Sequence, residues 1–313
     1  MKLYIVIPCY NEEEVLQETS KQLKEKINQL LEEGKIDKYS RIVFVDDGSK
    51  DKTWSMIEQL HEQDELYSGV KLSRNRGHQN ALLAGLTTVV DYADAVISMD
   101  ADLQDDINAI DGFIQAYNKG YEVVYGVRNA RKNDTAFKRF TAEGFYKIMK
   151  MLGAEVVFNH ADYRLLSQRA LRGLLEFDEV NLFLRGMVPM VGYKSTNVYY
   201  ERNERFAGES KYPLKKMLAF AWQGISSLSI KPIRFIISLG MATFCISIIM
   251  LIYFLVRYFT GNTVNGWTSL IVSIWALGGL QLLAIGVIGE YIGKVYLEAK
   301  HRPKFLVEQF INK

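Results

Sequence analysis

The first 130 residues alternate between short apolar runs and longer segments in which apolar residues recur with a helical period. The apolar runs, each of a kind typical of buried strands, occur at 3–7, 41–45, 69–72, 95–99 and 122–126. The helical patterns lie between them, at 12–33, 52–64, 78–91 and 106–119. Alternating strands and helices predict parallel strands joined by crossover helices, and uninterrupted apolar strands predict a sheet covered on both faces.

Polar residues gather where each of the first four predicted strands ends, in the clusters PCYNEEE, DDGSKDKT, SRNRGHQN and DADLQDD. In sheets of this kind, ligands bind outside the carboxyl ends of the strands. Each cluster alone has a simpler explanation, because Asn11, Ser49 or Asp51 can cap a helix. Gly48 and Gly77 can likewise serve as turn residues. Four clusters at one edge, each longer than a cap requires, favour a binding site.

The fourth cluster concentrates negative charge at the end of an apolar strand. Asp100 and Asp102 are two residues apart, so on an extended segment their carboxylates point to the same side. Such carboxylates repel each other unless positive charge lies between them. A divalent cation, Mg²⁺ or Mn²⁺, bound partly through phosphate oxygens would satisfy both, with Gln104 as a third oxygen ligand. The alternative is a solvated acidic loop.

The composition changes near Lys231. Residues 235–256 carry no charge and are long enough to cross about 30 Å of hydrocarbon, and a second uncharged span covers 267–289. We therefore predict a two-helix transmembrane hairpin, with a buried helical hairpin of a soluble protein as the alternative. Residues 213–232 mix lysines with apolar and aromatic residues, which predicts an interfacial helix or an ordinary amphipathic surface helix.

Charges around the two spans predict their orientation. The link TGNTVNG carries none, whereas lysine and arginine flank the outer ends at Lys231, Arg234, Lys294, Lys300, Arg302 and Lys304. By the positive-inside rule both termini are cytoplasmic, and Arg257, on the far side, would snorkel. The predicted organisation is a cytoplasmic domain at 1–212, the interfacial region at 213–232, the hairpin at 233–293 and a cytoplasmic tail at 294–313.

Several functional classes are disfavoured by composition. Lys plus Arg total 38 against 36 for Asp plus Glu, and a net charge of +2 gives no general attraction to nucleic acid. Cys9 lies in a predicted strand and Cys245 in an apolar span, so we expect no disulfide, in agreement with a reducing compartment. Neither GxGxxG nor GxxxxGKS occurs, which argues against a dinucleotide fold and a P-loop.

In this order, the motifs resemble those of the inverting family 2 glycosyltransferases of GT-A fold, particularly the membrane-anchored polyprenyl-phosphate glycosyltransferases. That group includes dolichyl-phosphate mannose synthases and bactoprenol glucosyltransferases. IPCYNEEE resembles the family's PxYNE, VDDGSKDKT its DDGSxDxT, LSRNRGHQNAL its RNxGxxxA and MDADLQDD its DADLQDP, with Asp106 where proline is usual. ADYRLLSQRAL resembles the acceptor-side segment, NLFLRG the Arg-bearing helix and RFAGESKY the RxxGxSKY loop.

This resemblance covers nearly the whole chain and implies an α/β, GT-A (Rossmann-like) nucleotide-sugar domain with a C-terminal two-helix transmembrane hairpin. It implies that the nucleotide is bound by Pro8, Tyr10, Glu12, Asp46 near the base, Asp47, Asn75, Gly77, Asp100 and Ala101. Asp100, Asp102 and Gln104 would hold the metal ion on the diphosphate. Phosphate and acceptor contacts would come from Arg128, Arg131, Arg185, Arg205 and Lys211, each with a solvated surface charge as the alternative.

The resemblance also implies catalytic roles for Asp162, Arg205 and Lys211. A lipid phosphate is mostly ionised near neutral pH, so it needs cationic positioning more than a strong base. Arg205 and Lys211 lie in a glycine-containing loop that could close over the phosphates. Asp162 is the candidate base or acceptor-orienting group, and an ion pair with Arg164 is the alternative.

The leading hypothesis is therefore an inverting hexosyl transfer to undecaprenyl phosphate at the cytoplasmic leaflet of the bacterial cell membrane. The resemblance favours glucose from UDP-glucose, use in cell-surface or wall polymers, and a homotetramer, while N-acetylglucosamine, galactose and mannose stay open. One alternative is a processive polysaccharide synthase, for which we would expect a QxxRW motif that this sequence lacks. Another is a non-catalytic membrane scaffold, which predicts decay of the acidic cluster.

Overall fold

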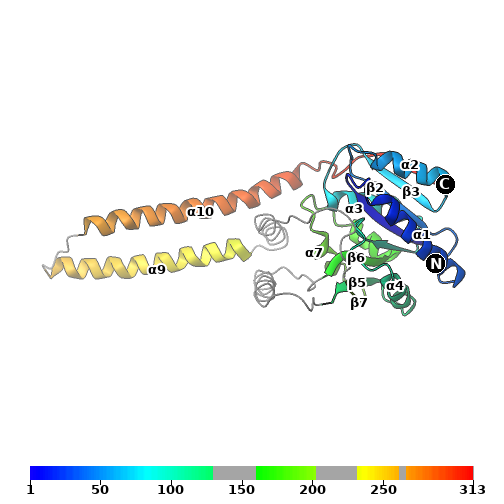
Figure 1. The fold of residues 1–313 in the computed structure, drawn as a ribbon. Coiled ribbons are helices and arrows are strands. Elements are labelled where there is room, and N and C mark those ends of the chain that lie inside the picture. Colours follow the sequence, from blue (N-terminus) through cyan, green and yellow to red (C-terminus); the bar gives the residue numbers. More distant parts are fainter. Residues whose placement is uncertain (130–159, 202–230, 261–265, 313) are drawn as a thin grey trace.

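The chain forms an α/β domain from which two long helices project, in a computed structural model (Figure 1). The structure describes residues 1–129, 160–201, 231–260 and 266–312. Both the amino-terminal segment and the carboxyl-terminal segment lie at the α/β domain, and the two helices extend away from it together.

Four parallel strands occupy the centre of the sheet, as the sequence predicted. They are β1 (Leu3–Cys9), β2 (Arg41–Asp46), β3 (Tyr67–Leu72) and β4 (Ala95–Ser98). Within the described residues the sheet has eight strands in the order β7-β5-β6-β4-β1-β2-β3-β8. Because β1 to β4 run parallel, their carboxyl ends lie at one edge of the sheet, as the alternation of strands and helices predicted.

The outer strands are β5 (Val123–Arg128), β6 (His160–Ser167), β7 (Ser195–Tyr200) and β8 (Val307–Ile311). Of these, only β5 was predicted. β6 runs antiparallel to both β4 and β5, β7 runs parallel to β5, and β8 runs antiparallel to β3. The sheet is therefore mixed, and β8 lies within the segment for which the sequence predicted only a tail.

Among the described residues, three helices cover each face of the sheet. On one face lie α1 (Leu16–Glu32), α2 (Thr53–Gln63) and α4 (Ala109–Asn118), whose buried side chains share a core with β1. On the other lie α3 (His78–Val89), α6 (Gln168–Leu175) and α7 (Leu184–Met190). The prediction of a sheet covered on both faces is confirmed.

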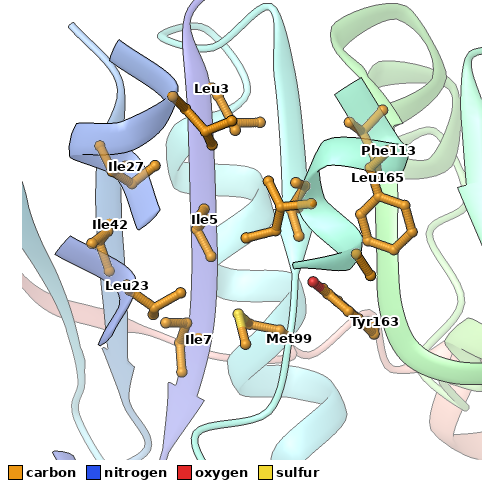
Figure 2. Close-up of a cluster of buried hydrophobic side chains, with 14 of the residues drawn as sticks. Leu3, Ile5, Ile7, Leu23, Ile27, Ile42, Met99, Phe113, Tyr163 and Leu165 are labelled. Carbon is orange, nitrogen blue, oxygen red and sulfur yellow. The ribbon is translucent and has the colours of Figure 1, made fainter. Parts of the chain in front are cut away.

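Alternation along β1 divides its side chains between the two cores. Leu3, Ile5 and Ile7 belong to the core shared with α1, where Figure 2 shows them beside Leu23 and Ile27. The intervening residues of β1 belong to the core shared with α3. All seven residues of β1 are buried, and each fully buried Leu or Ile contributes about 1.5–3 kcal/mol. Polar side chains therefore become accessible only where the strand ends.

The long helices are α9 (Lys231–Phe259) and α10 (Trp267–Ala299). Each includes a stretch that is long and apolar enough to cross a membrane, at Lys231–Met250 and Ala276–Ala299, with none of it buried within the protein. The helices contact each other and run side by side (Figure 1). The predicted spans fall within them, whereas residues 213–230 of the predicted interfacial region lie outside the described residues.

The chain returns to the sheet after α10. Strand β8 pairs with β3, where Gly69 lies opposite Ile311. A Cβ atom on Gly69 would lie 2.6 Å from Ile57 Cγ2 and 3.1 Å from Ile311 Cδ1, so glycine permits α2 and β8 to pack closely at this point. The pair of long helices thus ends in a segment that belongs to the α/β domain.

Candidate functional site

The loops that follow β1 and β2 are joined by hydrogen bonds. The Asn11 N–H donates to Ser49 Oγ at 3.0 Å, and the Lys50 N–H donates to Asn11 Oδ1 at 2.9 Å. Asn11 has a φ of 53°, a left-handed conformation that asparagine tolerates well. The capping alternative for Asn11 is wrong, because α1 begins at Leu16 without a side-chain cap. Asn11 instead fixes two of the predicted clusters against each other.

Asp47 fixes the loop that follows β3. Its carboxylate accepts hydrogen bonds from the N–H groups of Arg76 at 2.6 Å and Gly77 at 2.8 Å. Burial raises the pKa of Asp47, although these N–H groups act in the opposite direction. Gly48 permits this arrangement, because its φ is +67° and a Cβ there would lie 2.7 Å from the Asn75 backbone nitrogen. Asp47 therefore supports the SRNRGHQN loop from behind.

The other predicted nucleotide-binding residues lie at the same edge with different accessibility. Tyr10, Asn75 and Gly77 are exposed, and Glu12 is half-buried. Pro8, Asp46 and Ala101 are buried. Asp46 accepts a hydrogen bond from the Ser49 N–H at 3.2 Å, and burial raises its pKa. The exposed members are accessible to a ligand at this edge, whereas the buried members are not.

The acidic loop follows β4 and carries the predicted metal ligands. Asp102 accepts a hydrogen bond from the Gln104 N–H at 3.2 Å, and the Gln104 side chain is largely buried. Burial, together with the charges of Asp162, Asp105 and Asp102, raises the pKa of Asp100 to about 6, against the opposing effect of His78. The loop therefore crowds negative charge where the sequence predicted a cation.

The residues of this loop fit a hard divalent cation. Asp100, Asp102 and Gln104 offer oxygen ligands, the type that Mg²⁺ and Mn²⁺ prefer. A cation would offset both the burial and the neighbouring negative charges that raise the pKa of Asp100. Within the described part of the chain, no three His, Cys, Asp or Glu side chains form a group that could hold a metal ion. Two carboxylates and an amide, with ligand phosphates, thus remain the predicted coordination set.

On the other side of the acidic loop, Asp162 of β6 is held by two arginines. It pairs with Arg164, as the alternative prediction proposed, and with Arg185 of α7, whose Nη2 lies 3.0 Å from Asp162 Oδ2. Burial alone would raise the pKa of Asp162, but Arg185, His78 and Arg164 hold it well below its usual range. Asp162 is therefore ionised and a weak base, which favours an orienting role.

His78, at the start of α3, lies between the acidic loop and Asp162 of β6. It was not among the predicted site residues. Its Nε2 lies 3.6 Å from Asp100 Oδ1 and 3.6 Å from Asp162 Oδ2. Burial lowers the pKa of His78, but the two carboxylates outweigh it and raise the pKa overall. The signal in the sequence was its place in the SRNRGHQN cluster. Its pairing with Asp162 depends on β6, a strand that the pattern did not predict.

Arg128, predicted to bind phosphate, is paired with the acidic loop. Its Nη2 donates to Asp105 Oδ1 at 3.0 Å and its Nε donates to Tyr200 Oη at 3.2 Å. Tyr200 also donates to Asp105 Oδ1, at 2.5 Å. Asp105 is buried, so the alternative of a solvated surface charge for Arg128 is wrong.

Three further predicted cations, Arg131, Arg205 and Lys211, lie outside the described residues. The described edge therefore brings together the loops after β1, β2 and β3, the acidic loop, and a carboxylate–guanidinium cluster on β6 and α7. His78 lies between Asp100 of the acidic loop and Asp162 of the carboxylate–guanidinium cluster.

Comparison with known proteins identifies the family. A family model described as "Glycosyl transferase family 2" matches residues 4–175. The chain belongs to glycosyl transferase family 2. Among relatives of this family 2 chain, the glycosyltransferase YkoT of Bacillus subtilis is 54% identical over 306 residues, covering 98% of this chain and 91% of that protein. The bactoprenol glucosyl transferase of Shigella phage SfV is 39% identical over 312 residues, covering 98% of each chain.

Solved structures with a similar arrangement include the mannosyltransferase PcManGT from Pyrobaculum calidifontis in complex with GDP-Man and Mn²⁺. Its TM-score is 0.45 at 15% identity, covering 93% of this chain and 87% of that chain. The predicted family resemblance, the GT-A-like mixed α/β fold and the assignment as a glycosyltransferase are confirmed. In this family 2 enzyme, the four loops at the carboxyl edge of the sheet form the candidate active site.

Proposed function

We propose that this glycosyltransferase transfers one hexose from a nucleotide sugar to a polyprenyl phosphate, with glucose from UDP-glucose as donor and undecaprenyl phosphate as acceptor. The observation that carries the proposal is the similarity to a bactoprenol glucosyl transferase, because it extends over 98% of both chains and so includes α9 and α10. Those two helices are long and apolar enough to cross a membrane. A lipid acceptor gives them a function in catalysis, since the substrate is held in the same bilayer.

The donor would bind against the loops that follow β1 to β3. Tyr10, Asn75 and Gly77 would contact the nucleoside from the exposed side, and Asp47 would keep the third loop in place through its bonds to Arg76 and Gly77. Asp100, Asp102 and Gln104 would hold Mg²⁺ or Mn²⁺. Such an ion stabilises the negative charge that develops on the departing nucleoside diphosphate.

The acceptor would approach from the side of β6 and α7. Its phosphate oxygen attacks the anomeric carbon while the bond from that carbon to the diphosphate breaks on the opposite face, which inverts the configuration. The attacking phosphate is already ionised, so no base has to remove a proton. Asp162 orients the fork of Arg185, with Nη2 and Nε at 3.0 and 3.3 Å from its two oxygens. We propose that Arg128, Arg131, Arg205 and Lys211 complete the cationic surroundings.

The same proposal places the enzyme in the bacterial cell membrane, with the catalytic domain and both termini in the cytoplasm. Lysine and arginine near the ends of the hairpin that meet the domain support this orientation. The return of the chain to β8 supports a common side for the domain and the carboxyl terminus. The homotetramer implied by the family resemblance stays part of the proposal.

The deciding experiment uses the purified full-length enzyme in detergent with Mg²⁺ or Mn²⁺, undecaprenyl phosphate and a panel of labelled UDP-, GDP- and dTDP-sugars. We expect label from one donor, UDP-glucose, to enter the lipid phase. Asp102→Ala should abolish the transfer, whereas Asp91→Asn, at an exposed carboxylate outside the site, should retain it.

Each other outcome would change a different part of the proposal. Label from a different donor would replace glucose in the proposal and keep the acceptor. A product that carries more than one sugar would favour a processive synthase. No label from any donor, in enzyme that still binds a nucleoside diphosphate in a metal-dependent way, would exclude the lipid acceptor. Loss of that binding as well would favour the non-catalytic scaffold.

A further inference from the structure

The end of α10 is bonded to the segment that precedes α7. Glu298, in the last turn of α10, accepts hydrogen bonds from the Val180 N–H at 2.9 Å, the Asn181 N–H at 2.9 Å and Asn181 Nδ2 at 2.7 Å. A carboxylate that accepts two backbone N–H groups and an amide forms charge-assisted bonds, which are stronger than neutral ones. One side chain therefore fixes both the backbone and a side chain of this segment.

A second contact binds the same segment from the chain that follows α10. Lys304 Nζ lies 3.1 Å from Asp178 Oδ1 and donates to the Phe177 carbonyl oxygen at 3.4 Å. Asp178 is 86% exposed in its side chain, so this ion pair is weakened by solvent, whereas the partners of Glu298 are half-buried. Glu298 is thus the stronger of the two attachments.

The attached segment leads directly into the site. Asn181 is four residues before Arg185, the α7 guanidinium that pairs with Asp162. The beginning of α7 is also fixed to α3, because the Leu184 N–H donates to Gln79 Oε1 at 2.9 Å, one residue after His78. A short run of chain therefore connects the end of a candidate membrane span to the cluster of Arg185, Asp162 and His78.

We infer that Glu298 is a positioning residue that holds α7, and with it Arg185, at a fixed place relative to the bilayer. This inference rests on the proposed function. A polyprenyl phosphate has its chain in the membrane, so its phosphate can reach only a narrow range of depths. The active-site guanidinium must be held at that depth, and α10 both contains a candidate membrane span and bonds to the segment before α7.

The test compares two acceptors that differ in their dependence on the bilayer. One is undecaprenyl phosphate in lipid vesicles with the reconstituted enzyme, and the other is a water-soluble, short-chain isoprenyl phosphate. For Glu298→Ala we expect kcat/KM for the vesicle acceptor to fall by at least about tenfold, because a mutation far from the chemistry can cost that much when it misplaces the reacting groups relative to each other. The KM for the donor and kcat/KM for the soluble acceptor should change by less than about twofold.

Two matched variants complete the design. Glu298→Gln keeps one oxygen that accepts an N–H and should restore part of the loss with the vesicle acceptor. Glu308→Ala removes a half-exposed carboxylate from the same C-terminal segment. Glu308 pairs with Lys71 of β3, and this variant should behave like the wild type. Hydrogen exchange at the amides of residues 180 and 181 should accelerate in Glu298→Ala and not in Glu308→Ala.

The outcomes separate this inference from the proposed function. If the wild type transfers no sugar to either phosphate, the proposed lipid-phosphate acceptor is wrong. If the wild type is active but Glu298→Ala loses activity equally with both acceptors, or loses none, Glu298 does not position the site relative to the bilayer. Unchanged hydrogen exchange at residues 180 and 181 would also overturn the inference, whatever the acceptor.

Discussion

The carboxylates of the candidate site share one edge of the sheet but differ in their partners. Asp162 is paired with Arg164 and Arg185, and Asp105 with Arg128. Asp100 lies near His78 and three other carboxylates, and its pKa is raised to about 6. The carboxylates therefore differ in what they can do: Asp105 and Asp162 pair with neighbouring arginines, whereas the charge of Asp100, like that of Asp102, would be stabilised by a bound cation.

Removing the partner of Asp105 should destabilise the fold. In Arg128→Met, Asp105 would stay buried with Tyr200 as its remaining described hydrogen-bond donor. Breaking a buried ion pair costs about 3–5 kcal/mol, and we expect a decrease of this size in the free energy of unfolding of the purified enzyme. Arg172→Met is the control, because Arg172 and Asp91 are 59% and 75% exposed and such pairs contribute about 0–1 kcal/mol. Equal effects would mean that the pair is not buried in solution.

Neutralising Asp162 should reduce transfer without creating a new pH dependence. Asp162→Asn keeps the shape but releases Arg185 from its charged partner, so we expect kcat/KM to fall by about tenfold or more, with nucleotide affinity unchanged. Because its pKa lies well below the usual range, Asp162 is ionised at every pH above about 5. An acidic limb of the wild-type rate profile above that pH should therefore persist in the variant, shifted to lower pH because the charge of Asp162 helps to raise the pKa of Asp100. A limb that disappears in Asp162→Asn would identify Asp162 as a titrating base.

At the scale of elements, the central strands could be predicted because they are buried on both faces. The apolar runs at 3–7 and 41–45 lie within β1 and β2, since burial on two faces leaves no polar alternation to obscure them. β7 alternates between exposed and half-buried positions, and β8 is mostly exposed. Edge strands of this kind have no strong apolar pattern, so the sequence did not distinguish them from loops.

Close packing of α3 on the sheet gives a prediction at this scale. A Cβ atom on Gly85 would lie 2.5 Å from Val6 Cγ1 and 2.5 Å from Val45 Cγ2, two stiff β-branched side chains. Alanine in place of glycine normally stabilises a helix by about 1 kcal/mol, but overpacking a core costs about 1–3 kcal/mol. We therefore expect Gly85→Ala to lower the melting temperature.

Thr87→Ala, an exposed position of the same helix, is the matched control and should change stability by less than about 0.5 kcal/mol. If Gly85→Ala instead raises the melting temperature, α3 can move away from β1 and β2 without cost. Loss of nucleotide binding in a stable Gly85→Ala enzyme would show that the position of α3, which begins at His78, is transmitted to the site.

The site was predictable as far as it is local in the sequence. Asp100, Asp102 and Gln104 lie in one loop, and Asn75 and Gly77 lie in another, as the clusters indicated. The partners of Arg128, and the pairing of His78 with Asp162, depend on contacts between strands and helices far apart in the chain. Side-chain periodicity contains no information about such contacts, so sequence reasoning did not predict the pairing of Arg128 with Asp105 and omitted His78.

For the whole molecule, the important feature is that the chain leaves and rejoins the same domain. β7, the last described strand before α9, and β8, which follows α10, both belong to the sheet of the α/β domain (Figure 1). Two antiparallel spans would return the chain to the side from which it started. The attachment of Glu298 to the segment before α7 adds a second connection between α10 and the domain.

This topology predicts a pattern of cysteine accessibility in cells. In a background with Cys9→Ala and Cys245→Ala, we would place single cysteines by Glu62→Cys on α2, Arg302→Cys after α10 and Asn262→Cys between the long helices. A membrane-impermeant maleimide should label only Asn262→Cys in intact cells, and all three after permeabilisation, because the positive-inside rule places the domain in the cytoplasm. The reverse pattern would invert the orientation but keep the topology. Different labelling of Glu62→Cys and Arg302→Cys would contradict it, because β8 holds the segment after α10 against β3 of the same domain.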